Sequence, residues 1–427
     1  MKRYFFIMIA LISSVGISQA QQRLSLAEAM EYATKSRYDA QANRIDIDLA
    51  ENAVNQARNE WIPEITATGQ VLYNVKLQTM IFDSGEEFQM GTKNLTTLGL
   101  ELNQPLYKPG LTTDIKINKA ALSVQKEVLR EKENDIKMYV VEAYLNVILR
   151  EQQLELSRTS TERYKSYFDL AKDKMELGTI LESELLQAQT DYENARTELQ
   201  KVEQTYDLAM KALKYHLNLP DTETLILTDS LSVLLNDNPM QVWNTTIEDR
   251  PELRELYYSG QENDLRLKKS SMTWAPTISL VANYTTEFQA SNFNYSRQLW
   301  FPYNYVGIKA SFTLSNLFKL GANRREYKLK SSQLAMQYNQ KKHDISYEID
   351  KCNTELLNAT GNIRATTRTL DLSKELYSGQ LAIYRLGTIT YSALLDAESS
   401  VSTAEQNYIT AVYDYLIAYY NYKKVTR

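Results

Sequence analysis

Few residues in this chain have the types and spacing that chemistry requires. His216 and His343 are the only histidines, and neither has Cys, Asp or Glu nearby at a metal-ligand spacing. Cys352 is the only cysteine, which excludes an internal disulfide. No GxSxG, HExxH or phosphate-binding loop occurs. We therefore predict no catalytic, cofactor or metal site, and we expect these three residues to pack as ordinary helix residues.

The charge balance indicates no nucleic-acid partner. Lys and Arg number 48 against 53 Asp and Glu, so the net charge is −5 at pH 7. There is no basic field that would attract a phosphate backbone. Tyrosines gather near the C-terminal end of the sequence, and we expect them to pack between helices rather than bind a ligand. They are Tyr408, Tyr413, Tyr415, Tyr419, Tyr420 and Tyr422.

The remaining candidate residues lie in a stretch that occurs twice. The first copy, LGTILESELLQAQ, begins at Leu177, and the second, LGTITYSALLDAE, begins at Leu386. In each copy a long helical pattern runs into the glycine, which can adopt φ > 0 and end a helix. Ser183 and Ser392 then begin a new helical pattern, as N-cap residues would. Each copy is therefore predicted to be the tip of a hairpin between two long helices.

Residues 1–20 have the pattern of a signal peptide. Lys2 and Arg3 precede an apolar run that ends near Ile17, and Ser18-Gln19-Ala20 fits the cleavage rule, so the mature chain is expected to begin at Gln21. No Cys follows the run, so no lipid anchor is expected. Beyond residue 20 no apolar run reaches the roughly 20 residues of a membrane helix. The pattern predicts export without retention in the inner membrane.

The scarcity of glycine and proline suits long elements. Helical spacing predicts helices at 24–59, 111–174, 183–217 and from about 322 to 385, followed by a last helix toward the C-terminus. Alternating apolar and polar residues predict four strands, which begin near Ile65, Thr97, Ile278 and Val306. Loops are expected at 78–94 and around 300–302.

The order of these elements is the same in both halves of the sequence. Trp61-Ile62-Pro63 and Trp274-Ala275-Pro276 enter the first strand of each half. Leu106–Gly110 and Leu317–Gly321 follow the second strand of each half. We therefore expect a first structural repeat at 21–218, a connector at 219–248 and a second repeat at 249–427.

Each predicted strand has one apolar and one polar face and about the length that crosses an outer membrane. Four strands cannot close a membrane barrel, and open edges are not tolerated in lipid, so several copies are required. A water-exposed sheet packed on a helix is the alternative for any one strand. Aromatic residues near the strand ends are expected to form an interfacial girdle. They are Tyr73, Tyr284, Phe288, Trp300, Phe301, Tyr303 and Tyr305.

Over essentially all of its mature length the chain resembles the TolC family of outer-membrane efflux proteins. The resemblance rests on the doubled LGT…S…LL.A tip, the doubled Trp-x-Pro-x-Ile strand entry, and Gln104-Pro105-Leu106-Tyr107. It implies a mainly α fold with a membrane β-barrel share and an internal two-fold repeat. In a homotrimer, four transmembrane strands per protomer would form one barrel in outer-membrane lipid, and long helical hairpins would form a periplasmic α-barrel.

The resemblance also implies a function and partners. The protein would be the channel-tunnel of a tripartite efflux or type I secretion system, passively conducting small molecules or exported cargo. Its tips would dock a periplasmic adaptor, or membrane fusion protein, bound to an inner-membrane transporter of the RND, ABC or MFS type. The docking residues would be Leu177, Gly178, Thr179, Ser183, Leu185, Leu186, Leu386, Gly387, Thr388, Ser392, Leu394 and Leu395.

In the family, polar contacts and acidic residues near the tips hold the tunnel mouth closed. The matching positions that keep suitable residues are Glu184, Tyr384 and Asp396. Ala393 stands where the family has a second acidic residue, and Ile389 stands where it has an arginine. The resemblance therefore implies a gate with a thinner polar network and an entrance that binds cations less well.

Two other classes of protein are compatible with parts of the sequence. An exported coiled-coil structural or scaffold protein of the cell envelope would explain the helices but not the alternating strands. An exported enzyme would require a catalytic cluster, which is not found. The sequence does not predict the cargo, because the transporter would select it.

Overall fold

The structure is a computed structural model of the 427-residue chain, and it describes residues 22–237, 247–293, 295 and 300–426. The expected signal peptide and the mature start at Gln21 lie outside the described residues. The chain forms two compact units, which are described separately. Unit 1 comprises 1–44, 128–252 and 341–427, and unit 2 comprises 45–127 and 253–340.

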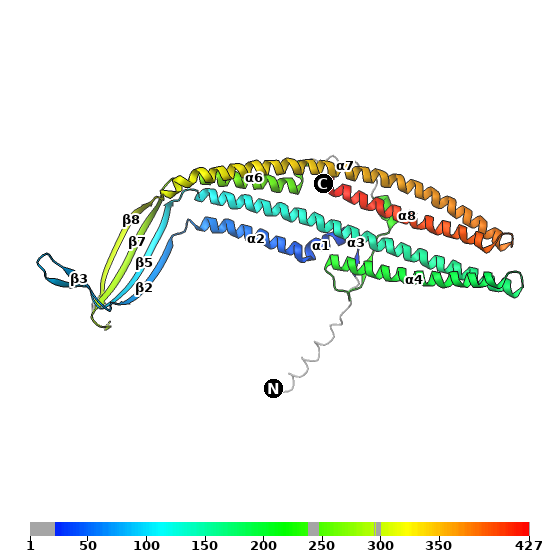
Figure 1. Cartoon of the computed structure of the whole chain (residues 1–427), viewed down its shortest axis with the longest axis horizontal. Coiled ribbons are helices and arrows are strands. Elements are labelled where there is room, and N and C mark those ends of the chain that lie inside the picture. The colour runs from blue at the N-terminus through cyan, green and yellow to red at the C-terminus, as the bar shows by residue number, and fades with distance from the viewer. Residues whose placement is uncertain (1–21, 238–246, 294, 296–299, 427) are drawn as a thin grey trace, which may run out of the picture. The chain divides into compact units, whose positions relative to one another are not determined.

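Four long helices dominate the described chain (Figure 1). They are α3 (Leu111–Glu176), α4 (Glu182–Leu217), α7 (Ser315–Arg385) and α8 (Tyr391–Thr426). The prediction of two long helical hairpins is confirmed. In unit 1, α3 and α4 form one hairpin and α7 and α8 form the other.

The start of α7 differs from the prediction. The segment Leu317–Gly321 was expected to precede the helix, but it lies inside α7, whereas its counterpart Leu106–Gly110 ends a strand and turns. Pro109 precedes Gly110, whose φ is +85°, so the chain cannot continue as a helix there. Leu320 replaces that proline in the second half, and the helix can begin seven residues earlier than expected.

The predicted helix over 24–59 is wrong in one respect, because it is two helices, α1 (Leu26–Ser36) and α2 (Tyr38–Asn59). Ser25 and Glu28 form a capping box: the Ser25 side chain accepts from the Glu28 backbone, and Glu28 accepts from the Ser25 N–H over 2.8 Å. Arg37 interrupts the helix with an extended backbone at φ −69° and ψ 135°.

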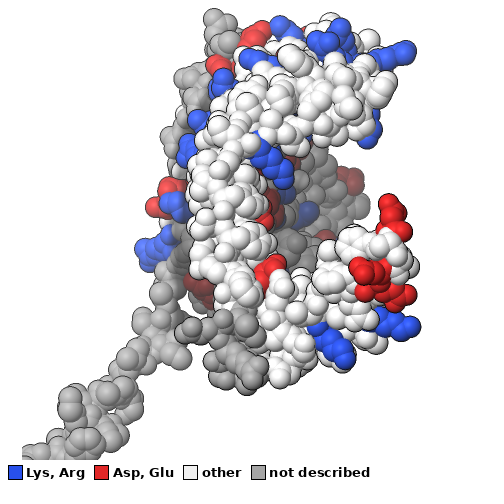
Figure 2. Space-filling view, turned by 90° about the vertical axis from the view of Figure 1, so that its left-hand side faces the viewer, with Lys and Arg blue, Asp and Glu red and all other residues white. Residues whose placement is uncertain are grey.

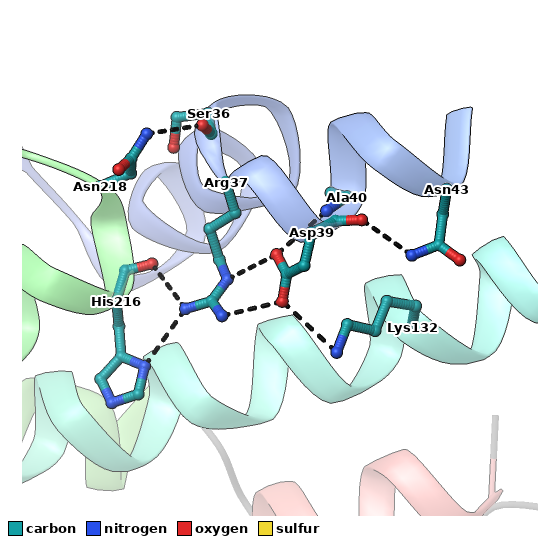
Figure 3. Close-up of polar contacts among 8 residues, drawn as sticks. All are labelled: Ser36, Arg37, Asp39, Ala40, Asn43, Lys132, His216 and Asn218. Carbon is teal, nitrogen blue, oxygen red and sulfur yellow. Dashed lines mark hydrogen bonds and ion pairs between the residues drawn. The ribbon is translucent and has the colours of Figure 1, made fainter. Parts of the chain in front are cut away.

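Polar contacts fix this break within unit 1 (Figure 3). The Arg37 guanidinium donates to both carboxylate oxygens of Asp39, over 3.0 and 2.9 Å. The Lys132 ammonium on α3 lies 3.3 Å from the same carboxylate. Arg37 also reaches α4, where it donates to the His216 carbonyl oxygen over 3.5 Å and lies 3.4 Å from His216 Nδ1. One arginine therefore joins the α1–α2 junction to the end of α4.

The connector between the two halves belongs to unit 1. It contains β6 (Leu225–Leu227), α5 (Leu231–Asp237) and the short helix η1 (Ile247–Asp249). Strand β6 pairs in parallel with β1 (Gln22–Leu24). Asp229 follows β6 and accepts hydrogen bonds from the Leu26 N–H over 2.7 Å and from the Tyr144 hydroxyl over 3.0 Å. The start of the first half and the connector therefore meet on α3.

The apolar core of unit 1 confirms the expected role of the tyrosines. Tyr415, Tyr419 and Tyr422 of α8 are buried in it, and Tyr408, Tyr413 and Tyr420 pack against it. Cys352 is also buried in this core, as expected.

Unit 2 contains α6 (Pro251–Ser270) and an antiparallel sheet of order β2-β5-β7-β8 (Figure 1). The strands are β2 (Glu64–Tyr73), β5 (Asn94–Tyr107), β7 (Thr277–Ala290) and β8 (Trp300–Ser311). The four predicted strands are confirmed. The loop expected at 78–94 instead contains a hairpin of β3 (Gln78–Ile81) and β4 (Glu87–Met90), and 300–302 begin β8 rather than form a loop.

The register of the sheet separates its two faces. Ile65, Leu102, Ala282 and Val306 share one row and therefore one face, which is apolar. The rows between them carry the opposite, more polar face. Within unit 2 both outer strands, β2 and β8, have an unpaired edge in this sheet of the described chain.

The register corrects the expected aromatic girdle. Tyr73, Tyr284, Phe288 and Trp300 lie on the apolar face, but Phe301, Tyr303 and Tyr305 lie on the polar face. Successive side chains along a strand project from opposite faces of the sheet. The position of a residue near a strand end therefore does not decide on which face its side chain lies.

Much of the apolar face is uncovered in the single chain. Ile65, Val71, Leu100, Val306 and Ile308 are all more than half exposed. Figure 2 views the side where Figure 1 draws the strands, and large described areas there carry neither positive nor negative side chains. Such a surface marks an interaction site with lipid or protein. Within the described residues, no helix combines the length and apolarity needed to cross a membrane.

Replacing Asp39 by Asn should lower the free energy of unfolding by about 1–2 kcal/mol at neutral pH, because the amide loses the charge that pairs with Arg37 and Lys132. The hydrogen bond from Arg37 is the main reason that the pKa of Asp39 falls from 3.8 to about 2. This stabilisation is present above pH 3.8 and is lost as the pH falls toward 2.

Thermal unfolding of both proteins at neutral pH and near pH 3 would measure this effect. The gap in Tm should narrow at the lower pH, and an unchanged gap would contradict the assignment. Asp48→Asn, at an exposed position of α2, is the control and should unfold like the wild type.

Candidate functional site

The first duplicated stretch ends α3 with a Schellman motif. Gly178 has φ +67°, and its N–H donates to the Met175 carbonyl over 2.9 Å. The Thr179 N–H donates to the Lys174 carbonyl over 2.9 Å. These two bonds satisfy carbonyls that the helix end would otherwise leave open, and the geometry requires a residue that tolerates positive φ.

The second stretch repeats this geometry at the end of α7. Gly387 has φ +76°, and its N–H donates to the Tyr384 carbonyl over 3.0 Å. The Thr388 N–H donates to the Ile383 carbonyl over 3.3 Å. An ideal Cβ at Gly178 or at Gly387 would meet no described atom within 4 Å, so backbone conformation and not space is the constraint.

The prediction that Ser183 and Ser392 are N-caps is wrong. Each is the second residue of its helix, α4 or α8. The N-cap residue of α4 is Leu181, whose backbone is extended and whose side chain makes no cap hydrogen bond. Before α8, the Thr390 hydroxyl accepts from the Ala393 N–H over 3.4 Å, in the N-cap pattern.

The leucines of the two tips differ in exposure. Leu177 and Leu386, at the turns, are 78% and 81% exposed. Leu186 is also exposed, whereas Leu185 and Leu395 are half-buried. The expectation of one exposed leucine patch is wrong for Leu394, which is fully buried. The most exposed of these leucines are therefore the two at the turns, and Leu186 adds a further exposed apolar side chain beside the first turn.

Leu394 is buried because the four helix ends share a small apolar cluster. Its buried members are Tyr167, Ala171, Ala188, Tyr384, Tyr391 and Leu394. Contacts between the two hairpins run along its border: the Lys174 ammonium lies 3.9 Å from the centre of the Tyr384 ring and donates to the Tyr384 carbonyl over 3.3 Å. The Tyr391 hydroxyl donates to Asp191 over 3.3 Å. The tips are therefore held together as one body.

The structure brings together two of the three residues expected to gate the tunnel mouth. Tyr384 is buried, and Glu184 is close enough that its charge, after burial itself, raises the pKa of the Tyr384 hydroxyl. No hydrogen bond joins these two residues in the part of the chain that the structure describes. Asp396 is exposed, and Ile389 packs against the apolar cluster. Ile389 therefore makes a hydrophobic contact at the position where the resemblance implies a charged residue.

Behind the tips lies a buried polar network that sequence reasoning missed. Glu398 of α8 is fully buried, and Arg163 of α3 donates from Nε to its Oε1 over 2.8 Å. The Tyr167 hydroxyl donates to the other carboxylate oxygen over 3.3 Å and also bonds the Tyr377 hydroxyl of α7. Arg163 also lies 3.7 Å from Glu405. This network ties α3 to α7 and α8.

A signal for Glu398 was present in the sequence. It lies between Leu394 and Val401 at helical spacing, on the face of α8 that is otherwise apolar. A carboxylate on such a face must be paired or neutral. Its partner could not be named, because Arg163 is more than two hundred residues away in the chain.

Electrostatics in this region follow from burial. Burial raises the pKa of Glu398, and the Arg163 guanidinium opposes that rise. Burial likewise raises the pKa of the Tyr167 and Tyr391 hydroxyls. The described residues include no group of three or more His, Cys, Asp and Glu that could hold a metal ion. The arrangement is therefore suited to holding helices together and presenting two exposed tips.

Comparison with known proteins assigns most of the chain to one family. The outer membrane efflux protein family matches residues 29–218 and 244–425. The two matched segments contain the two tips.

Characterised relatives are distant. The alkaline protease secretion protein AprF of Pseudomonas aeruginosa is 21% identical over 306 residues, which are 71% of this chain and 63% of AprF. The cation efflux system protein CusC of Escherichia coli is 24% identical over 269 residues, which are 61% of this chain and 57% of CusC. The matches thus span less than two thirds of either relative.

Solved structures share the fold at low identity. A crystal structure of CusC superposes with a TM-score of 0.76 at 15% identity, covering 94% of this chain and 91% of that one. The outer membrane protein VceC of Vibrio cholerae gives a TM-score of 0.72 at 12% identity, covering 94% and 96%.

Replacing Arg163 by Leu should destabilise the helical hairpins by about 3–5 kcal/mol, because Glu398 would remain buried without a cation. The double variant Arg163→Leu/Glu398→Leu should recover most of the loss, since both charges are then removed. Thermal unfolding followed by helical circular dichroism measures both. Arg158→Leu, which breaks only the exposed pair with Glu203, is the control and should cost less than about 1 kcal/mol. A double variant as unstable as the single one would argue against a buried ion pair.

Proposed function

The chain belongs to the outer membrane efflux protein family, and from this membership we propose that it is the channel-tunnel of a tripartite efflux or type I secretion system. The family consists of outer-membrane channels rather than enzymes, so the expectation that the chain is not an enzyme is confirmed. In the proposed role the protein passively conducts small molecules or exported cargo from the periplasmic side to the outside.

One observation carries the proposal, namely a sheet with an uncovered apolar face and two open edges. In lipid, an apolar outer face is favourable, but unpaired N–H and C=O groups along an edge are not. Pairing β8 of one copy with β2 of the next removes both edges. Three copies supply twelve strands, enough for a membrane barrel, whereas four strands are too few.

The same trimer gives the helices a role. The hairpins α3–α4 and α7–α8 of three copies would form a periplasmic α-barrel. We interpret residues 21–218 and 249–427 as two copies of one structural repeat, joined by the connector at 219–248. The repeated Schellman geometry of Gly178 and Gly387 supports this interpretation.

We further propose that the tips dock a periplasmic adaptor, which is bound to an inner-membrane transporter of the RND, ABC or MFS type. The support is that Leu177 and Leu386 expose apolar side chains at positions that the chain itself leaves uncovered. Leu394 acts indirectly, because it packs beneath the tips. The names of AprF and CusC point to different cargoes, a protease and cations, so the family alone does not fix the cargo.

We assign the closed mouth to contacts between the hairpins. Tyr384, held by Lys174 and close to Glu184, is the central residue of this proposed gate. Asp396, exposed on α8, supplies negative charge near the entrance.

Leu177→Asp combined with Leu386→Asp should abolish efflux in intact cells while trimers reach the outer membrane at normal level, because only exposed apolar contacts are lost. Leu177→Met with Leu386→Met keeps those contacts and should behave like the wild type. Efflux, surface abundance and adaptor crosslinking are the measurements. Adaptor crosslinking at the wild-type yield in the Asp variant would refute docking through these leucines.

Gly387→Val should also impair efflux, because a β-branched residue at φ +76° is strained by about 1–2 kcal/mol. Gly387→Asn is the matched control, since Asn tolerates this conformation, and it should retain most activity. Equal activity of the two variants would show that the turn does not need this backbone geometry.

The barrel is tested by adjacent residues of β8. Ala310→Arg places charge on the apolar face and should cost about 2–4 kcal/mol near the bilayer midplane, whereas Ser311→Arg lies on the polar face and should be tolerated. Native mass spectrometry in detergent should report three copies for the wild type and Ser311→Arg, with less trimer for Ala310→Arg. Equal loss of trimer in both variants would contradict the assignment of the two faces.

A further inference from the structure

Three aromatic side chains form a ladder on the polar face of the sheet. Phe301, Tyr303 and Tyr305 are alternate residues of β8, so all three project from one face at intervals of about 7 Å. They are 57%, 52% and 52% exposed. An exposed aromatic row on the more polar face is unexpected for a surface that only contacts water.

The neighbouring strands give this ladder an acidic border. Glu287 pairs with Phe301, and Asn283 pairs with Tyr305. Glu101 lies next to Asn283 in the same row. The only cation of β8 on this face is Lys309, which lies four residues beyond Tyr305, or about 13 Å along the strand. Carboxylates therefore border the rings more closely than any described cation of this sheet face does.

The residues beside the ladder on the same face of the sheet include two glycines. Gly99 lies between Thr68 and Thr285 in the row of Tyr303. A Cβ at Gly99 would lie 2.8 Å from the Thr68 hydroxyl and 3.2 Å from the Thr285 hydroxyl, which confirms that these residues share the face. Gly307, two residues after Tyr305, also adds no side chain. Small residues thus leave the ring faces accessible from the side.

The ladder differs from the aromatic residues on the opposite face. There, Phe288 is fully buried, with its ring centre 4.7 Å from that of Tyr295 and 5.5 Å from that of Trp300. The Tyr295 hydroxyl lies 3.0 Å from the Thr96 hydroxyl. Those three rings therefore pack against one another. Among the described residues, no ring of the ladder contacts another aromatic ring or a cation.

We propose that Phe301, Tyr303 and Tyr305, with Glu101 and Glu287, form a binding track for organic cations that carry aromatic or alkyl groups. The ring faces attract a cation, and quaternary ammonium groups suit such faces well. The carboxylates add charge complementarity and disfavour anions. This inference rests on the proposed function, because the polar face lines a pore only if the strands close a barrel in lipid.

The test uses the full protein reconstituted as single channels in planar bilayers. Benzyltrimethylammonium should block the wild-type current at a concentration at least tenfold lower than tetramethylammonium, which has the charge without the ring. Phenylmethanesulfonate, of similar size and opposite charge, should not block. Equal block by all three ions would overturn the proposal.

Substitutions in the track should change block by the cation without abolishing conduction through the channel. Phe301→Ser/Tyr303→Ser/Tyr305→Ser should raise the half-blocking concentration of benzyltrimethylammonium about tenfold or more while the channel still conducts. Glu101→Gln/Glu287→Gln should raise it less, by removing charge and retaining the rings. Tyr284→Ser, an aromatic on the opposite face, is the matched control and should leave block unchanged.

The outcomes distinguish the two proposals. Wild-type channels that conduct but show no preference for the aromatic cation would overturn the track and leave the channel intact. Block that persists in the triple serine variant would also overturn the track. A wild-type protein that forms no conducting species would overturn the channel and the track together.

Discussion

Unpaired backbone at the edges of one sheet is the constraint on which the rest of the structure depends. β2 and β8 each have one side without a strand partner, and the face between them is apolar. In water such a sheet would aggregate, and in lipid its edges would leave polar groups unsatisfied. In the proposed trimer, pairing with other copies would remove both open edges. The long helical hairpins would then form part of the wall of a larger assembly.

At the tips, some charged and aromatic side chains are buried and the leucines at the turns are exposed. Charged and aromatic groups behind them, such as Arg163 and Glu398, are buried and tie three helices together. The side chains at the turns, Leu177 and Leu386, have no comparable contacts and remain exposed. For the proposed adaptor docking, a preorganised base is favourable, because less conformational entropy is lost when a partner binds.

Features that depend on local periodicity were predicted correctly from the sequence. The long helices and the four strands follow from spacings of 3.6 and 2, and the tip glycines follow from their freedom at positive φ. The capping residues and the start of α7 were local errors, whereas other predictions failed where distant segments decide the outcome. Leu394 is buried by helices from the other hairpin, and the face of Tyr303 depends on register with β7. The break at Arg37 depends on Asp39 and on contacts with Lys132 and His216, which no local pattern indicates.

The pairing of β1 with β6 has a consequence for the order of folding. Residues 22–24 pair with residues 225–227, and the core that they cover also includes residues of α8, which are far away in the sequence. Contacts of such long sequence separation form slowly, because loop-closure entropy is lost before they stabilise anything. This part of unit 1 is therefore expected to form after the local contacts within each helical hairpin. Until it forms, apolar residues of this core such as Leu24 and Leu225 are exposed, which favours aggregation of a folding intermediate.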